Sequence, residues 1–296
     1  MRDAAPVDQF SHDVQRMPAL DGLRGLAALS VVLYHFALVT GLGELVGPGR
    51  FVGRVLASGW VGVDLFFVLS GYLITDHLLD RRDEPLYYSA FFARRLLRVV
   101  PLYVVFVGAY LGLLPLLTRA LGAQRMLPTG IEHARAHALW LVSYTANLWM
   151  AVTGQRIGAA LEPVWSLCVE IHYYLLWPAL VRRLATSQLV RVALAGLCFG
   201  WLLRVGLFAA GSSAQAIYFA TPTRLDAVFV GTLLAAAQRE PATSAWLVRW
   251  GSRIGVLATL VLVVSWLAHR GFEPQQASTV VLGYSAVALT AGALLH

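Results

Sequence analysis

The sequence predicts an all-α integral membrane protein: a polytopic helical bundle of about eight or nine transmembrane segments, one of them re-entrant. Its 296 residues are 58% hydrophobic and only 13% charged, whereas a soluble domain carries about 25% charged residues. The apolar residues form blocks of about 18 to 23, which is the length that spans ~30 Å of hydrocarbon at 1.5 Å per residue. These blocks lack the period-two alternation of a transmembrane β-barrel.

Nine apolar segments follow one another without a Gly/Ser-rich linker or a soluble domain between them. Residues 1–18 are polar and lack the apolar core of a signal peptide, so we expect a cytoplasmic N-terminal tail and an uncleaved first helix. The remainder, 19–296, is expected to form one transmembrane domain. Its segments run approximately over 19–41, 59–79, 96–117, 137–153, 163–180, 189–210, 214–237, 254–268 and 278–295.

Arginines set the predicted orientation. Five of them lie in 76–98, so this loop and the N-terminus are expected on the cytoplasmic side. Nine spans would place two later Arg-bearing loops outside, whereas a non-spanning 137–153 segment returns both loops to the inside. We therefore predict eight spans plus one re-entrant segment. The formal charge of +7 then reflects topology, and no nucleic-acid partner is expected.

Ionisable residues inside the apolar segments are the candidate functional residues, because a charge near the bilayer centre costs at least ~2.5 kcal/mol. His35, Asp64 and Glu170 lie about 9, 7.5 and 10 Å from the expected outer ends of their helices, so they share one level. An imidazole beside a carboxylate can act as a general base, and the alternative is a buried His–Asp pair that only joins helices. The other intramembrane candidates are Arg24, His172, Arg204, Arg224 and Asp226.

Arg224 and Asp226 are two residues apart and therefore lie on different faces of a helix. We expect each to meet a partner on another helix, with structural pairing and substrate binding both open. Arg24 is grouped with Arg224 and Asp226. These three residues are expected either to line a passage through the bundle or to form structural ion pairs. Gly108 and Gly112, which have GxxxG spacing, are predicted helix-packing positions.

A basic cluster marks the cytoplasmic start of the third segment. Arg94, Arg95 and Arg98 lie there, and Arg94 and Arg98 share a helix face, a geometry suited to binding phosphate. The alternative is the ordinary placement of positive charge on the inner side. No metal site is expected, because His133 and His137 are four residues apart but lack a third ligand.

Five stretches occur in order over 19–237 and together resemble one known family. They are LDGLRGLAALSVVLYHF (20–36), GWVGVDLFFVLSGYLIT (59–75), ARRLLRVVPLY (93–103), LEPVWSLCVEIHYYLLWP (161–178) and TRLDAVFVG (223–231). The sequence resembles the membrane acyltransferase-3 family, the bacterial multi-span O-acyltransferases that modify envelope sugars and some secreted small molecules. Ile171 and His172 replace the Glu and Gln usual in the fourth motif, so only Glu170 carries over. The family's C-terminal helix is expected to be missing, as in a fragment or a shortened member.

The resemblance implies an enzyme, an acyltransferase for groups other than aminoacyl groups. It would move an acyl group, commonly acetyl, from cytoplasmic acyl-CoA to a carbohydrate hydroxyl at the outer face of the bacterial inner membrane. No permanently bound cofactor is implied. The expected partners are membrane lipid, the acyl-CoA donor and a carbohydrate or glycosylated small-molecule acceptor. Two other classes stay open: a saccharide transporter or exporter, and an inactive accessory membrane protein.

Roles for the candidate residues follow from the resemblance and the residue chemistry together. His35 would act as general base on the acceptor hydroxyl or carry the acyl group covalently, and Asp64 would orient it. Glu170 would bind the acceptor or serve as a second acid/base. The acyl-CoA donor would be held by Arg94, Arg95 and Arg98. The acceptor's identity, the acyl chain length and the oligomeric state are not determined by the sequence.

Overall fold

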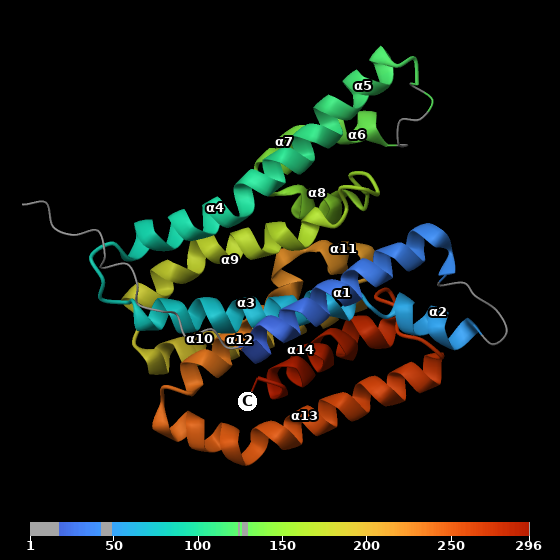
Figure 1. The fold of residues 1–296 in the computed structure, drawn as a ribbon. Coiled ribbons are helices and arrows are strands. Elements are labelled where there is room, and N and C mark those ends of the chain that lie inside the picture. The colour runs from blue at the N-terminus through green and yellow to red at the C-terminus, as the bar shows by residue number, and fades with distance from the viewer. Residues whose placement is uncertain (1–17, 43–48, 124, 126–129, 296) are drawn as a thin grey trace, which may run out of the picture.

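The computed structural model describes residues 18–42, 49–123, 125 and 130–295, and all the regular elements in these residues are helical (Figure 1). This confirms the all-α prediction. The expected tail, 1–18, lies outside the described residues apart from Pro18, where the first helix begins. The α-helices are α1 (Pro18–Thr40), α2 (Arg50–Ala57), α3 (Val61–Asp80), α4 (Tyr87–Gly108), α5 (Leu114–Ala120), α6 (Ile131–Ala136), α7 (Ala138–Val142), α8 (Ala146–Thr153), α9 (Val164–Arg183), α10 (Thr186–Ala209), α11 (Ala214–Phe219), α12 (Leu225–Ala237), α13 (Pro241–His269) and α14 (Tyr284–Ala293).

Within the described residues, six helical stretches are long and apolar enough to cross a membrane: α1, α2–α3, α4–α5, α9, α10 and α13. The chain is therefore a multi-pass membrane protein. The predicted count of eight or nine segments is not confirmed by these six. The predicted segment 214–237 is divided into α11, a 3₁₀ turn and α12, and the predicted segment 278–295 into a π-helical turn and α14.

The predicted re-entrant segment, 137–153, forms short helices rather than one long one. With the helix before it, the region consists of α6, α7 and α8, of six, five and eight residues. Eight helical residues extend only ~12 Å, well short of the ~30 Å hydrocarbon layer. The re-entrant placement of 137–153 stays a prediction.

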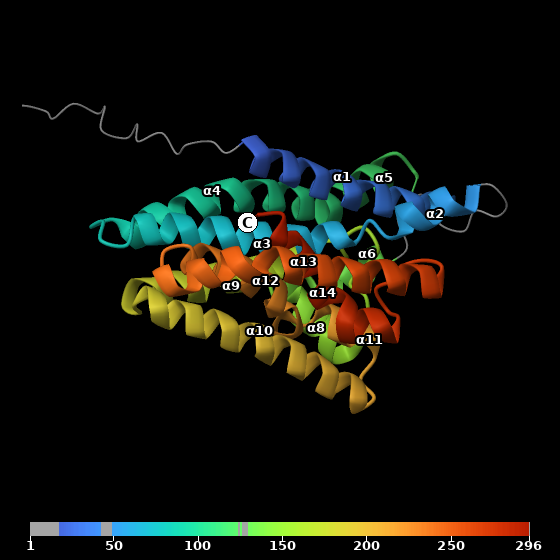
Figure 2. The ribbon, with the colours of Figure 1, turned by 90° about the horizontal axis from the view of Figure 1, so that it is seen from below.

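The centre of the bundle is the crossing of α3 and α12, and Figure 2 shows α1 and α10 on opposite sides of this pair. A Cβ atom at Gly71 would lie 2.0 Å from the carbonyl oxygen of Val228, and one at Gly231 would lie 1.9 Å from that of Val68. Only glycine permits this backbone approach, which is how small residues drive helix packing in lipid. The crossing fixes which face of α3 is turned toward α12.

The predicted packing role of Gly108 and Gly112 is wrong. A Cβ atom at either glycine would have no neighbour within 4 Å in the part of the chain that the structure describes. The two glycines lie at the point where α4 passes into a π-helical turn, Ala109–Leu113, and then into α5. Glycine spacing along one helix thus does not identify a packing position without a second helix opposite it.

The break between α11 and α12 places two charged residues inside the bundle. The 3₁₀ turn Thr221–Arg224 contains Pro222, and the Thr223 hydroxyl donates to the carbonyl oxygen of Ala220 at 2.8 Å. Irregular backbone at membrane depth is stable only where protein surrounds it, and Thr221, Thr223 and Arg224 are buried. Asp226 lies in the first turn of α12, where the helix dipole favours a negative charge.

Candidate active site

A cavity of about 480 Å³ lies among α1, α3, α4 and α9. Its charged lining residues come from three helices: Arg24 from α1, Arg95 and Arg98 from α4, and Glu170 from α9. Most of the other lining residues are apolar, among them Val31 and Phe67. The structure therefore brings together four of the residues that the sequence singled out, and it groups Arg24 with the cluster predicted to bind acyl-CoA.

Glu170 is fixed on the cavity wall by two hydroxyl groups. Ser70 of α3 donates to Glu170 Oε1 at 2.9 Å, and the Tyr174 hydroxyl donates to the same oxygen. Both residues also line the cavity. Sequence reasoning missed them, although Tyr174 follows Glu170 by four residues, the spacing at which helical side chains meet.

The three arginines of α4 do not point the same way. The Arg95 guanidinium carbon lies 5.6 Å from the ring centroid of Tyr174 and 5.9 Å from that of Phe91, so aromatic faces hold it beside the cavity. Arg94 is absent from the cavity lining and donates instead from Nη2 to His77 Nε2 of α3, at 2.9 Å. Arg95 and Arg98, three residues apart, are the pair that shares the cavity face.

His35 lies one helical turn beyond the cavity residue Val31 on α1. His35 Nδ1 is 2.8 Å from the carbonyl oxygen of Val31. A carbonyl only accepts hydrogen bonds, so Nδ1 carries the proton and Nε2 of the neutral ring keeps its lone pair. The half-buried imidazole is thus held in the tautomer that can accept a proton at Nε2.

The expected pairing of His35 with Asp64 is not formed. Asp64 is fully buried, and its Oδ1 accepts from Arg224 Nη2 at 2.6 Å. The physical reason is the rotation of α3: Asp64 lies one turn from Val68 and two turns from Gly71, which are the residues that meet α12 at the helix crossing. The carboxylate therefore faces α12 and not the cavity.

Another carboxylate, Glu162, lies within electrostatic range of His35. It belongs to the turn before α9 and forms an ion pair with Arg156 at 3.1 Å. Burial raises the pKa of the Glu162 carboxyl, and the neighbouring charges of Arg156 and His35 oppose this rise. Sequence reasoning missed Glu162 because it lies at the edge of an apolar segment and not inside it.

Arg224 and Asp226 meet partners on other helices, as their spacing predicts. Arg224 pairs with Asp64 of α3, and Asp226 Oδ2 accepts from Arg204 Nη2 of α10 at 2.8 Å. Ser285 of α14 also donates to Asp226 Oδ2, at 2.6 Å. These contacts join four helices in the interior of the bundle, apart from the cavity.

The Arg224 guanidinium is enclosed by aromatic rings. Its central carbon lies 4.0 Å from the ring centroid of Tyr284, 5.1 Å from that of Tyr218 and 5.7 Å from that of Trp165. Its Nε and Nη1 atoms have no hydrogen-bond partner among the described residues. Ring faces therefore supply part of the stabilisation that hydrogen bonds would otherwise give to this buried cation.

Three further histidines of the described residues, His133, His137 and His172, make local contacts. His172 Nδ1 is 2.8 Å from the Thr221 hydroxyl, which also accepts from Asn147. His133 and His137 lie against each other and against the Trp149 ring. Among the described residues no group of three or more metal-ligating side chains could hold a metal ion.

Comparison with known sequences assigns the family. The family model described as "Acyltransferase domain" matches residues 17–295. The chain belongs to the acyltransferase-3 family. The O-acetyltransferases OatA of Staphylococcus aureus strains NCTC 8325 / PS 47 and COL are each 30% identical to it over 233 residues, which cover 74% of this chain and 34% of each relative. This acyltransferase-3 chain thus spans about one third of the length of these relatives. No solved structure matches it.

Proposed function

We propose that the chain is a membrane O-acyltransferase that moves an acyl group, acetyl in the first instance, from acyl-CoA to a carbohydrate hydroxyl. One observation carries the proposal: Arg24, Arg95 and Arg98 converge from two helices on a cavity that also holds Glu170. The family supports acyl transfer, and relatives named O-acetyltransferase support an acetyl group and an oxygen acceptor.

The arginines suit a polyanionic donor. CoA carries several phosphate groups, and planar guanidinium groups bind phosphate with two hydrogen bonds each. Arg95 and Arg98 share a face of α4, and Arg24 lies across the cavity on α1. The apolar lining around Val31 and Phe67 suits the pantetheine arm, which would carry the thioester along α1 toward His35.

His35 would act as the general base. Its Nε2 lone pair accepts the proton of the acceptor hydroxyl while that oxygen forms a bond to the thioester carbonyl carbon. The carbon–sulfur bond then breaks, and the departing thiolate takes the proton back from the imidazolium. Glu170, oriented by Ser70 and Tyr174, would bind the acceptor. Glu162 and not Asp64 would stabilise the imidazolium charge.

We place the arginine-lined end of the cavity on the cytoplasmic side of a bacterial inner membrane. The support is the arginine-rich region 76–98, which comprises the end of α3, the loop 81–86 and the start of α4. In this topology α1 runs outward, and the broken segments α11–α12 and 278–295 each reach across the layer, giving eight crossings. His35 is then nearer the outer face than Arg24, so donor and acceptor approach from opposite sides.

The test is thiol release from acetyl-CoA by the purified chain in nanodiscs, with a hydroxyl-rich acceptor mixture present. Wild type is compared with His35→Ala and with His269→Ala, an exposed histidine at the end of α13. We expect release from wild type and His269→Ala and none from His35→Ala. An active His35→Ala protein would contradict the role of His35, and failure of wild type to bind CoA in a titration would contradict the proposed function.

A further inference from the structure

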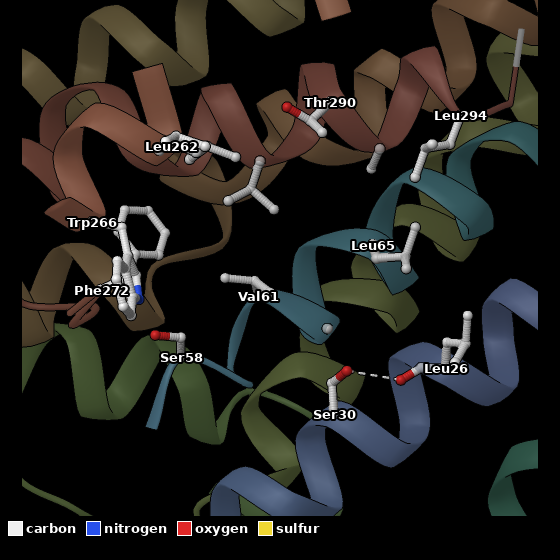
Figure 3. A pocket seen from close by; sticks show the side chains of 14 residues that line it. Leu26, Ser30, Ser58, Val61, Leu65, Leu262, Trp266, Phe272, Thr290 and Leu294 are labelled. Atoms are coloured by element: carbon white, nitrogen blue, oxygen red, sulfur yellow. Dashed lines mark hydrogen bonds between the residues drawn. The ribbon is translucent and has the colours of Figure 1, made fainter. Parts of the chain in front are cut away.

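A second hollow, here called the apolar groove, lies between α1, α3, α13 and α14 and has a volume of about 390 Å³. Figure 3 shows Trp266, Phe272 and Val61 at one end and Leu26, Leu65 and Leu294 at the other. Its volume lies within the ~300–1,000 Å³ typical of ligand pockets. It is separate from the candidate active site, on another face of α1.

The groove offers a ligand almost no polar contact. Ser30 donates to the carbonyl oxygen of Leu26 at 2.9 Å (Figure 3), and Ser58 donates to that of Arg54 at 2.8 Å. The third hydroxyl group of the lining, that of Thr290, lies 3.3 Å from the hydroxyl of Thr259. All three hydroxyl groups are thus used within the protein. At the mouth Leu26 is 59% exposed and Leu294 63% exposed, so the groove is continuous with the lipid-facing surface. A hydrocarbon chain fits this environment.

Positive charge gathers at the Trp266 end of the groove. Arg54 lies one turn before the groove residue Ser58, and Arg50 and Arg270 lie within electrostatic range of Arg54. Phe51, between the two α2 arginines, packs edge-on against the Trp266 ring with centroids 5.8 Å apart. The aliphatic stem of Arg54 also approaches the loop after α13, where a Cβ at Gly271 would lie 4.0 Å from Arg54 Cγ.

This charge is not explained by membrane topology. In Figure 1, α2 and the end of α13 lie together at one end of the bundle, and α4 begins at the opposite end. The positive-inside rule places an excess of arginine on the cytoplasmic side, and the arginines of α4 supply this excess. The rule predicts no second cluster of arginines at the opposite end of the bundle. Aromatic residues such as Trp266 are typical of the headgroup level, where a lipid phosphate lies.

We infer that the apolar groove binds a membrane lipid with an anionic phosphate headgroup. One hydrocarbon chain of the lipid lies in the groove, and Arg50, Arg54 and Arg270 bind the phosphate. The positive charge of the arginines selects an anionic headgroup. Because the groove is open to the bilayer, the hydrocarbon chain of the lipid can enter it laterally. The bound hydrocarbon chain would pack against α1, which otherwise contacts mainly α2 and α3. This helix carries Arg24 and His35. This inference does not depend on the proposed function.

The test is photo-crosslinking of the full chain in nanodiscs that contain phosphatidylglycerol with a diazirine in one acyl chain. A matched phosphatidylcholine probe, which has no net charge, is the control lipid. We expect adducts on the α3 and α14 residues of the groove, with phosphatidylglycerol labelling exceeding phosphatidylcholine labelling. Arg54→Gln and Arg270→Gln should each lower this excess by about fivefold, whereas Arg249→Gln, at an exposed α13 position, should leave it unchanged.

A second pair of variants tests the groove itself. Val263 lines the groove and is 47% exposed, so Val263→Trp fills it with little risk to folding. Leu257 is 63% exposed on the same helix and does not line the groove. We expect Val263→Trp to remove the groove adducts and Leu257→Trp to preserve them.

Three results would overturn the inference. The first is labelling of groove residues no stronger than labelling around Leu257. The second is equal labelling by the two lipids that is insensitive to Arg54 and Arg270. The third is crosslinking of one copy of the chain to another through the groove, which would identify it as an interface between copies.

Discussion

Breaking the Asp64–Arg224 ion pair should destabilise the bundle strongly. Both side chains are at most 1% exposed, and Asp64 Oδ1 lies 2.6 Å from Arg224 Nη2. Removing one partner of a buried pair costs about 3–5 kcal/mol, because the other charge stays buried without compensation. In Asp64→Asn the Arg224 guanidinium keeps its aromatic neighbours but loses its counter-ion. We expect the free energy of unfolding to fall by this amount.

The assay is thermal unfolding of the purified chain in detergent, followed by size-exclusion chromatography. At about 2–4 °C per kcal/mol, the expected loss corresponds to a fall in Tm of about 10 °C. The matched control is the double variant Asp64→Leu/Arg224→Met, which removes both charges and should recover most of the lost stability. Stability of Asp64→Asn within about 1 kcal/mol of wild type would refute the reasoning.

The same double variant separates the two roles open to Asp64. If Asp64 took part in the chemistry, the variant would fold and release no thiol from acetyl-CoA. The contacts lead us to expect the opposite, a folded double variant that still releases thiol, because Asp64 faces α12 and has no contact with His35. A folded double variant that releases no thiol would contradict this expectation. It would show that Asp64 takes part in the chemistry although it faces α12.

Three further outcomes are expected. Gly231→Ala should lower Tm sharply, because its Cβ would lie 1.9 Å from a backbone oxygen of α3, while Gly108→Ala, in open space, should not. Arg95→Gln should raise the KM for acetyl-CoA about ten- to hundredfold, because this factor corresponds to the free energy of one charge-assisted hydrogen bond. Arg94→Gln should raise the KM less in the same assay. Burial raises the pKa of Glu162, so the folded chain binds this proton more tightly than the unfolded chain. The free energy of unfolding therefore decreases as the pH rises from the pKa of Glu162 in the unfolded chain to its higher pKa in the folded chain. In a series of Tm measurements from about pH 4 to 7, Glu162→Gln should show a smaller decrease than wild type.

Arg94 and Arg95 show what helix periodicity predicts and what it does not. Arg94 and Arg98 share a face by i,i+4 spacing, and Arg95 and Arg98 share one by i,i+3 spacing. The sequence alone does not choose between these faces. The structure chooses the second, since His77 of α3 binds Arg94 and the Tyr174 ring holds Arg95 beside the cavity. Rotation of α4 about its own axis is the deciding quantity.

The sequence by itself determined the class of protein, the all-helical fold, the family and the candidate residues Arg24, Arg95, Arg98 and Glu170 that meet at the cavity. Hydropathy gives the class and the helical spans, because burial of about 20 apolar residues in lipid dominates the energy of each span. The five ordered motifs give the family, and charged residues within or beside apolar segments give the candidates. Only the tertiary structure decided that Asp64 pairs with Arg224 instead of lying beside His35. In a bilayer the lipid tails are as apolar as the helix surfaces, so hydropathy leaves the rotation of each helix undetermined. Close contacts such as the glycine crossing of α3 and α12 fix that rotation, and they exist only once both helices are in place.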